Sequence, residues 1–165
     1  MAPEEVIRLL DHLDGSGIRC WVDGGWGVDA LLGRQTREHS DLDVVIDDQG
    51  LTAAIDVIEE QGYAVIRDWL PSAIAFRREA DGAEVDLHPV RKTSDGGGDQ
   101  VQLDGVSTYR YAAPVSGSIT GRAVLCCPVD DQIRCHRGYE PTAKDRQDMA
   151  ELASAFGVAL PEPYI

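Results

Sequence analysis

Asp41 and Asp43 are separated by a single leucine, in an otherwise apolar run that extends to Ile46. Because side chains alternate between the two faces of a β-strand, both carboxylates would project from one face and the apolar residues from the other. Two carboxylates this close repel each other, which raises the pKa of one of them unless a cation lies between them. Oxygen ligands of this kind suit Mg²⁺. The pair therefore predicts a magnesium site, although a strand face exposed to solvent has the same pattern.

A third carboxylate occurs in a later segment with the same alternation, Glu84 to His88. The apolar residues of this segment would face the core, so Asp86 would share the opposite face with Glu84 and His88. If this segment is the strand next to Asp41 and Asp43, Asp86 completes a cluster of carboxylates. Such a cluster is typical of phosphoryl-type transfer, in which metal ions bridge phosphate oxygens and a carboxylate takes a proton from the attacking hydroxyl. A surface charge on an edge strand is the alternative interpretation.

Gly24 and Gly25 stand between a short apolar segment and a short helical pattern. Their N–H groups can approach a phosphate closely because no side chain intervenes, and the start of a helix adds a partial positive charge. Arg34, Arg37 and His39 follow shortly afterwards, directly before the paired aspartates. This combination predicts contacts to a triphosphate. A tight turn followed by a solvated loop would explain the same residues without any ligand.

The elements that would position these residues alternate between helix and strand. Apolar periodicity predicts helices at residues 4–14, 26–32, 51–61, 129–137 and 143–156. Alternation and turn residues predict strands at 18–22, 42–46, 63–67, 72–78 and 84–88, with weaker ones near 101–103 and 123–126. The Gly-rich segment 93–98 is expected to be a mobile loop.

This order indicates an α+β fold, with a mixed twisted sheet flanked by helices and followed by C-terminal helices. We expect residues 1–127 to form the core and residues 128–165 to form a helical segment packed on it, as two units or as a single domain. Chain length is sufficient for one well-developed hydrophobic core.

The composition restricts the class of partner. The chain has 29 acidic and 15 basic side chains and a formal net charge of −14, which makes nucleic acid an unlikely partner and favours small cationic molecules. No apolar run approaches the length of a membrane span, and the acidic start lacks the pattern of a secretory signal, so we expect no membrane partner and a cytoplasmic location. The four cysteines have no zinc-ligand spacing and are expected to be reduced thiols.

In this order, a strand, two glycines, a helix, a D-x-D strand and a later aspartate resemble the nucleotidyltransferase superfamily that includes DNA polymerase β. The chain looks most like the small antibiotic nucleotidyltransferases, the lincosamide branch more than the aminoglycoside 2''-nucleotidyltransferases. The resemblance is carried by WVDGGWGVDALLGRQTREHSDLDVVID, DWLPSAIAFRR, EVDLHPV and HRGYE, and it spans roughly residues 18 to 150. The segment RKTSDGGGDQVQLDGVSTYRYAAPVSGS matches no pattern of that branch, which leaves the identity of the drug open.

The resemblance implies a polymerase β-like core and an enzyme that transfers a nucleoside monophosphate to a hydroxyl group of an antibiotic. A nucleoside triphosphate, expected to be ATP, would be the donor, and pyrophosphate would be released. By resemblance, Asp41 and Asp43 bind Mg²⁺, while Asp86 joins the metal site and acts as the general base. A lincosamide is the expected acceptor and an aminoglycoside the nearest alternative.

Gly24 and Gly25 would, by the same resemblance, hold the nucleotide phosphates, and Arg37 and His39 would contact the triphosphate. The residues that bind the acceptor are not identified by the resemblance. Six further side chains are left open as possible substrate contacts: Trp26, Arg34, Trp69, His88, His136 and Tyr139.

Two other functions are compatible with part of the pattern. A nucleotidyltransferase toxin that modifies RNA would use the same chemistry, but it needs a basic surface that this acidic chain lacks. A protein that has lost catalysis and uses its carboxylates for structure or for protein contacts would not bind a metal–nucleotide complex. The resemblance also makes a homodimer plausible.

Overall fold

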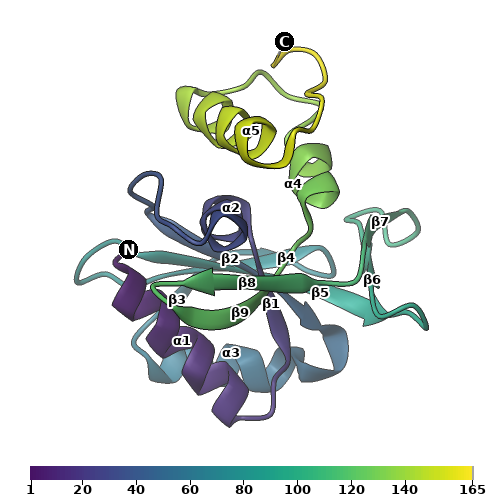
Figure 1. Ribbon diagram of the computed structural model, residues 1–165. Helices are drawn as coiled ribbons and strands as arrows, with labels where there is room; N and C mark the ends of the chain where they lie inside the picture. The colour runs from purple at the N-terminus through teal and green to yellow at the C-terminus, as the bar shows by residue number, and fades with distance from the viewer. Residues whose placement is uncertain (165) are drawn as a thin grey trace.

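The computed structural model describes residues 1–164, and its framework is one mixed β-sheet (Figure 1). Its strands are β1 (Cys20–Asp23), β2 (Asp41–Asp47), β3 (Ala64–Trp69), β4 (Ala73–Arg77), β5 (Glu84–Lys92), β6 (Gly98–Val101), β7 (Thr108–Tyr111), β8 (Val115–Ile119) and β9 (Arg122–Cys126). The main sheet has the order β3–β4–β5–β2–β1–β9–β8, and β6 and β7 form a hairpin that joins it through the end of β5. Strands β2 and β5 are parallel, whereas β1 and β2 are antiparallel.

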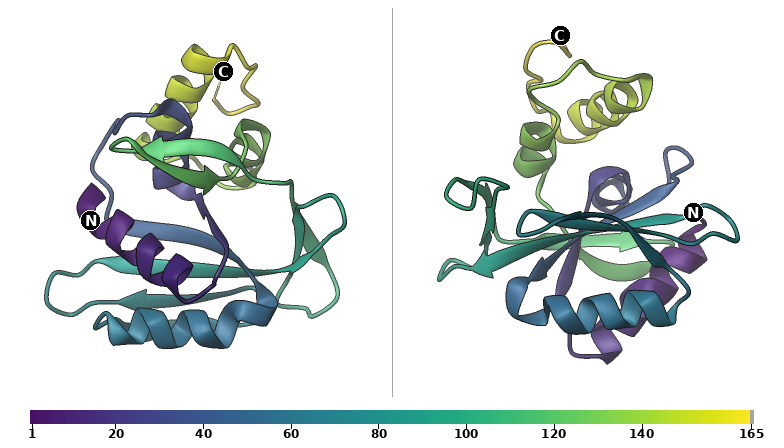
Figure 2. Two further views of the ribbon diagram at one scale, coloured as in Figure 1. Left: turned by 60° about the horizontal axis from the view of Figure 1, so that its bottom comes forward. Right: turned by 180° about the vertical axis from the view of Figure 1, so that it is seen from behind.

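Helices cover both faces of this sheet. They are α1 (Pro3–Gly15), α2 (Gly24–Leu32), α3 (Leu51–Glu60), α4 (Val129–Cys135) and α5 (Ala143–Phe156), with a single 3₁₀ turn, η1 (Asp48–Gly50), before α3. Helices α1 and α3 lie on one face, and α2 lies on the other beneath α4 and α5 (Figures 1 and 2). The α+β architecture with C-terminal helices is therefore confirmed. None of the helices within residues 1–164 has the length and apolar character needed to cross a membrane.

Alternating strand residues build the main core between the sheet and α1 and α3. Leu42, Val44 and Ile46 of β2 point into it and are fully buried, as are Val85 and Leu87 of β5. The aspartates that alternate with these residues must therefore lie on the other face, the one that carries α2. In both strands, the residues that face the core are the ones expected from the sequence.

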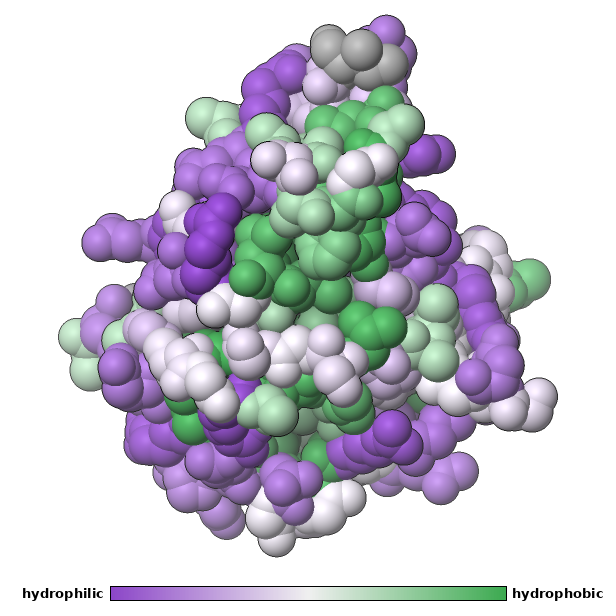
Figure 3. All heavy atoms as spheres, viewed as in Figure 1, coloured by the Kyte–Doolittle hydropathy of each residue, from purple (hydrophilic) through white to green (hydrophobic). Residues whose placement is uncertain are grey.

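The C-terminal segment packs on α2 through a second apolar cluster. Its buried members are Val28 of α2, Ile133 of α4, and Met149 and Leu152 of α5. Figure 3 shows hydrophobic residues gathered in this upper part of the molecule within a largely hydrophilic surface. The segment thus lies on the core, and its status as a separate domain stays a prediction.

The expected elements differ from the observed ones mainly after β5. The Gly-rich segment is a hydrogen-bonded turn, in which the Thr93 N–H donates to the Gly97 carbonyl at 3.0 Å, and Gly98 already belongs to β6. Strands β7 and β8 were not expected, because neither has a clear apolar alternation; β8 is VSGSI. Pairing with β9 along its whole length keeps β8 in the sheet.

Candidate active site

Three aspartates from three adjacent strands form a row across the sheet. Asp23 lies opposite Asp43 in the antiparallel pair β1–β2, and Asp43 lies opposite Asp86 in the parallel pair β2–β5. Residues directly opposite each other share a face, so the three carboxylates project to the side that carries α2. Asp41, two residues before Asp43 on β2, projects from the same face. Asp43 and Asp86 therefore lie on neighbouring strands, as expected from the sequence. The metal-binding role of these residues stays a prediction.

Asp23 belongs to this row although the sequence motifs did not single it out. It is the last residue of β1 and the N-cap of α2, and it is 5% exposed. Burial, followed by the negative charge of Asp43, raises the pKa of the Asp23 carboxyl, and its Oδ1 has no hydrogen-bond partner. Its position at a strand end directly before Gly24 was the available signal. The sequence alone gave no reason to align it with Asp43.

Asp86 carries the clearest electrostatic perturbation in the row. Burial, followed by the charge of Asp43, raises the pKa of the Asp86 carboxyl to about 6, while His88 and Arg67 act in the opposite direction. Its Oδ1 is buried without a hydrogen-bond partner. A carboxylate with this pKa is deprotonated at neutral pH and still basic enough to accept a proton from a hydroxyl group in a transition state.

The paired glycines form the first turn of α2 and not a separate turn before it. Gly24 has a positive φ of 57°, and a Cβ atom there would lie 2.1 Å from Asp43 Oδ2. At Gly25, a Cβ atom would lie 2.4 Å from His39 Nδ1 and 2.5 Å from Arg37 Nη2. The absence of side chains therefore lets the start of α2 rest directly against the carboxylate row and the cationic loop. Binding of nucleotide phosphates at this point stays a prediction.

Arg37 and His39 are both engaged by buried carboxylates. Arg37 forms a two-bond ion pair with Asp148 of α5, with Nε–Oδ1 at 2.8 Å and Nη2–Oδ2 at 2.7 Å. His39 Nε2 lies 2.5 Å from Asp29 Oδ2, and the ring centroids of His39 and Trp26 are 4.6 Å apart. In this conformation both side chains serve the packing of the loop under α2. To contact a triphosphate as predicted, Arg37 and His39 would have to leave these carboxylates or contact the phosphates while still paired with them.

The other side chains left open by the sequence have different environments. Trp26 and His136 are buried, whereas Trp69 and Tyr139 are exposed. Arg34 is exposed and paired with Glu151 at 2.6 Å. Trp69 lies on the same sheet face as Asp86, because it pairs with Ala73 and Ala75 pairs with Asp86. Of these aromatic residues, Trp69 is the one that the strand register places beside the carboxylate row.

The donor atoms of the row fit a hard cation. Within residues 1–164, no three His, Cys, Asp or Glu side chains converge closely enough to hold a metal ion by themselves. However, burial and then the charge of Asp43 raise the pKa of both Asp23 and Asp86, and each of those two has an unpartnered buried oxygen. A cation would relieve this repulsion, and Mg²⁺ in nucleotide sites is commonly held by one or two carboxylates together with phosphate oxygens. The carboxylates present therefore suit Mg²⁺ that arrives with a nucleotide.

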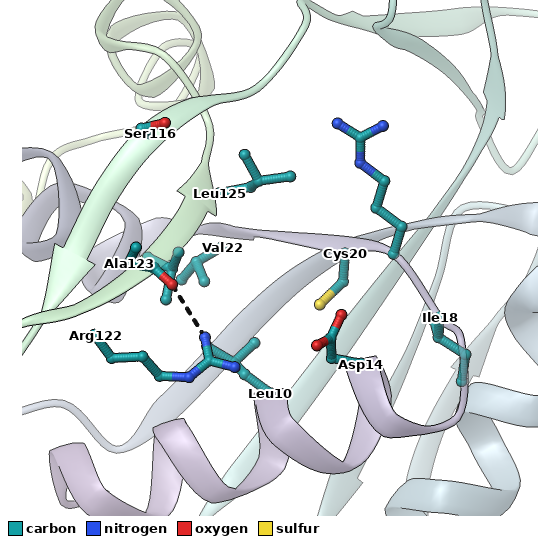
Figure 4. A pocket seen from close by; sticks show the side chains of 11 residues that line it. Leu10, Asp14, Ile18, Cys20, Val22, Ser116, Arg122, Ala123 and Leu125 are labelled. Carbon is teal, nitrogen blue, oxygen red and sulfur yellow. Dashed lines mark hydrogen bonds between the residues drawn. The ribbon is translucent and has the colours of Figure 1, made fainter.

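Two hollows in the described surface differ in their relation to this row. A cavity of about 370 Å³ lies between α1 and β9 and is lined by Leu10, Cys20, Val22 and Arg122 among others (Figure 4). It opens on the face opposite the aspartates, because Val22 alternates with Asp23 along β1. A second hollow of about 600 Å³ is lined by His39, Ser40 and Lys144 among others. The second hollow lies next to the start of β2, and the aspartates of the row are not among the residues that line it.

The sequence matches a family of known enzymes over most of its length. The model of the aminoglycoside-2''-adenylyltransferase family matches residues 5–152. A lincosamide resistance protein of Staphylococcus haemolyticus is 32% identical over 152 residues, which cover 92% of this chain and 94% of that protein. A 2''-aminoglycoside nucleotidyltransferase of Escherichia coli is 31% identical over 63 residues, which cover 38% of this chain and 36% of that protein.

Solved structures agree with the sequence matches. The crystal structure of the lincosamide antibiotic adenylyltransferase LnuA, with lincomycin bound, has a TM-score of 0.83 and 31% identity, over 93% of this chain and 98% of that one. The crystal structure of ANT(2'')-Ia with adenylyl-2''-tobramycin has a TM-score of 0.71 over 92% of this chain and 87% of that one; at 18% identity it shows a common fold. The chain belongs to the aminoglycoside-2''-adenylyltransferase family of nucleotidyltransferases.

Proposed function

We propose that this enzyme transfers a nucleoside monophosphate from a nucleoside triphosphate, expected to be ATP, to a hydroxyl group of a lincosamide and thereby inactivates the drug. The observation that carries the proposal is the row formed by Asp43 and Asp86 on adjacent parallel strands, with the start of α2 against it. It occurs in a chain that matches a lincosamide resistance protein over 92% of its length.

In the proposed mechanism, Asp41 and Asp43 would hold Mg²⁺, with Asp86 on the adjacent strand as the third carboxylate of the site. When bound, the metal would neutralise charge on the phosphate oxygens. Asp86 accepts the proton of the attacking hydroxyl, a role that suits its raised pKa. The N–H groups at the start of α2 would contact the phosphates, with the partial positive charge of the helix start in support.

The acceptor is proposed on the extent of the similarity and on charge. The lincosamide resistance protein matches nearly the whole chain, whereas the E. coli aminoglycoside enzyme matches 38% of it. Both drug classes carry amines, so the acidic row and the net charge of −14 would attract either one. An aminoglycoside is therefore the second candidate. An RNA acceptor is disfavoured by the same charge.

A mass-shift assay tests this function. Purified enzyme, Mg²⁺ and a mixture of the four nucleoside triphosphates would be incubated with separate lincosamides and aminoglycosides. We expect a lincosamide to gain the mass of one nucleoside monophosphate, with release of pyrophosphate. An Asp86→Asn variant should form product at least about 100-fold more slowly, and an Asp56→Asn variant of the exposed face of α3 should react like the wild type.

The outcomes separate the candidates. Product on aminoglycosides alone would replace the proposed acceptor with the second candidate. Metal-dependent nucleotide binding without transfer to any drug would contradict an antibiotic acceptor, and labelled RNA would then be tried in its place. Wild-type turnover by Asp86→Asn would refute the assignment of the general base.

A further inference from the structure

His88 lies on β5 two residues beyond Asp86, and its ring meets the neighbouring Asp43. His88 Nε2 is 3.3 Å from Asp43 Oδ1. The other oxygen of this carboxylate, Oδ2, lies against Gly24, where a Cβ atom would approach to 2.1 Å. The Asp43 carboxylate is therefore bounded by an imidazole on one side and by bare backbone on the other.

The second ring nitrogen of His88 is engaged by Gln100 of β6. Gln100 Nε2 is 3.2 Å from His88 Nδ1 and 2.7 Å from the Ser72 carbonyl oxygen. The amide of Gln102 donates to Gln100 Oε1 at 3.2 Å, so all contacts of Gln100 agree on the orientation of its amide group. An amide nitrogen only donates, so Nδ1 must accept, and the proton of the neutral ring lies on Nε2, directed at Asp43.

We propose that His88 is a positioning residue whose Nε2–H holds Asp43 in the orientation that binds metal, and that Gln100 maintains the required ring tautomer. This inference rests on the metal site of the proposed function and adds a residue to it. Carboxylates that ligate metals are commonly held by a hydrogen-bonding partner, and loss of such a partner typically lowers metal affinity or activity by about 10- to 100-fold.

The β6–β7 hairpin, which lies outside the main strand order, would support the site through Gln100. Gln100 is 6% exposed and connects His88 to Ser72, in the connection between β3 and β4. The orientation of Asp43 would therefore depend on two segments remote from it in the sequence. The β3–β4 connection directly follows Trp69, the exposed aromatic residue at the end of β3 on the face of the aspartate row.

Two substitutions at His88 separate a hydrogen-bonding role from a packing role. His88→Met fills a similar volume without a donor, whereas His88→Gln keeps an amide N–H near the position of Nε2. The affinity for a Mn²⁺ complex of a non-hydrolysable ATP analogue would be measured by calorimetry, beside kcat and KM. We expect His88→Met to weaken that affinity by about 10- to 100-fold and His88→Gln to stay within about threefold of the wild type. His12→Met, at an exposed position of α1, is the matched control and should change neither.

A measurement on the metal-free protein tests the tautomer directly. Long-range ¹H–¹⁵N correlation spectra of the imidazole rings should show His88 with its proton on Nε2, and Gln100→Met should remove this preference. A wild-type ring protonated on Nδ1 alone would overturn the proposal. So would a folded His88→Met variant with wild-type Mn²⁺–nucleotide affinity, or a His88→Gln variant as weak as His88→Met. If no drug is modified, the proposed acceptor fails, and the binding measurements still decide the role of His88.

Discussion

At the scale of single residues, the environment of Asp86 suits its proposed role as general base and carries a cost in stability. Burial, followed by the charge of Asp43, raises its pKa to about 6, so holding it charged in the metal-free protein opposes folding. The same shift provides a base of suitable strength for a hydroxyl group near neutral pH. The two effects can be separated by experiment, because the first needs no metal and no substrate.

Asp86→Asn should slow transfer strongly and stabilise the metal-free protein. Loss of the proposed general base should lower kcat by about 10²- to 10⁴-fold. At pH 7.5 the free energy of unfolding should rise by about 1 to 2 kcal/mol, after an allowance for solvent screening, because the charged carboxylate is no longer held in its unfavourable site. Steady-state kinetics and urea unfolding in a chelator would measure the two effects.

The pH dependence of that stability difference has a definite sign. The folded protein binds the Asp86 proton more tightly than the unfolded chain, so the wild type loses stability as pH rises between about 4 and 6. The gap between variant and wild type should therefore close below about pH 4. A gap that is independent of pH would contradict a raised pKa at Asp86. Asp56→Asn, on the exposed side of α3, should be neutral throughout.

We predict that Gly24 cannot be replaced without loss of activity, and its backbone conformation is only part of the reason. Both Gly24 and Gly82 have a positive φ, but a Cβ atom would meet Asp43 at Gly24 and nothing within 4 Å at Gly82. Each alanine substitution should cost about 1 to 2 kcal/mol for the left-handed conformation. Only Gly24→Ala should also displace the Asp43 carboxylate, and we expect its kcat/KM to fall by about 100-fold or more. Equal activity of the two variants would disprove the close approach.

At the scale of elements, α2 connects the aspartate row to the C-terminal helices. Its first residues lie against Asp43, and Val28 in its second turn is buried against α4 and α5. The loop after α2 is tied to α5 by the buried pair of Arg37 and Asp148. The C-terminal segment thus supports the start of α2 from outside the sheet.

Removal of Asp148 should expose the dependence of this arrangement on α5. Asp148→Ala leaves the Arg37 guanidinium partly buried without its partner, so we expect a loss of about 3 kcal/mol in the free energy of unfolding. Glu151→Ala removes the partner of the exposed Arg34 from the same helix and should cost less than about 1 kcal/mol. Urea unfolding would compare the two variants. A double variant, Arg37→Met with Asp148→Leu, should recover much of the lost free energy of unfolding. If it does not, the unpaired charge of Arg37 is not the main cause of the loss in Asp148→Ala.

At the scale of the whole molecule, the charge of −14 acts on every encounter with substrate. A cationic drug is attracted by this field, whereas a free triphosphate is repelled until a cation compensates its charge. The electrostatic contribution should therefore favour the acceptor and make nucleotide binding strongly dependent on Mg²⁺. Salt is the variable that tests this, because it shortens the range of the field.

Increasing ionic strength should slow the capture of a cationic acceptor. Between roughly 0.02 M and 0.5 M salt, we expect kcat/KM for an amine-bearing lincosamide to fall by about 3- to 10-fold. The same drug with its amine acylated is the matched control and should show a much weaker dependence, provided that it is still a substrate. Parallel salt dependence of the two acceptors would mean that the acidic field does not guide binding.

The sequence by itself determined the local features of the site. The alternation of β2 and β5, the C-terminal end of α2 at Gly33, and the sharing of one face by Asp41 and Asp43 all depend on neighbours within a few residues. Backbone geometry makes such features readable along the chain. The resemblance supplied the family and, with it, the expected reaction. Local periodicity was weakest after β5, where short polar strands are held mainly by their pairing partners.

Only the tertiary structure decided which distant groups meet. Asp23 enters the row through the antiparallel register with β2, and Arg37 finds Asp148 on a helix more than one hundred residues later. The side chain of His88 reaches Asp43, and Gln100 reaches His88 from a strand that the sequence did not predict at that position. Strand register and helix packing arise from contacts between segments far apart in the chain, and no local pattern specifies them. The residues that could do chemistry were therefore readable in the sequence, while their partners were set by the fold.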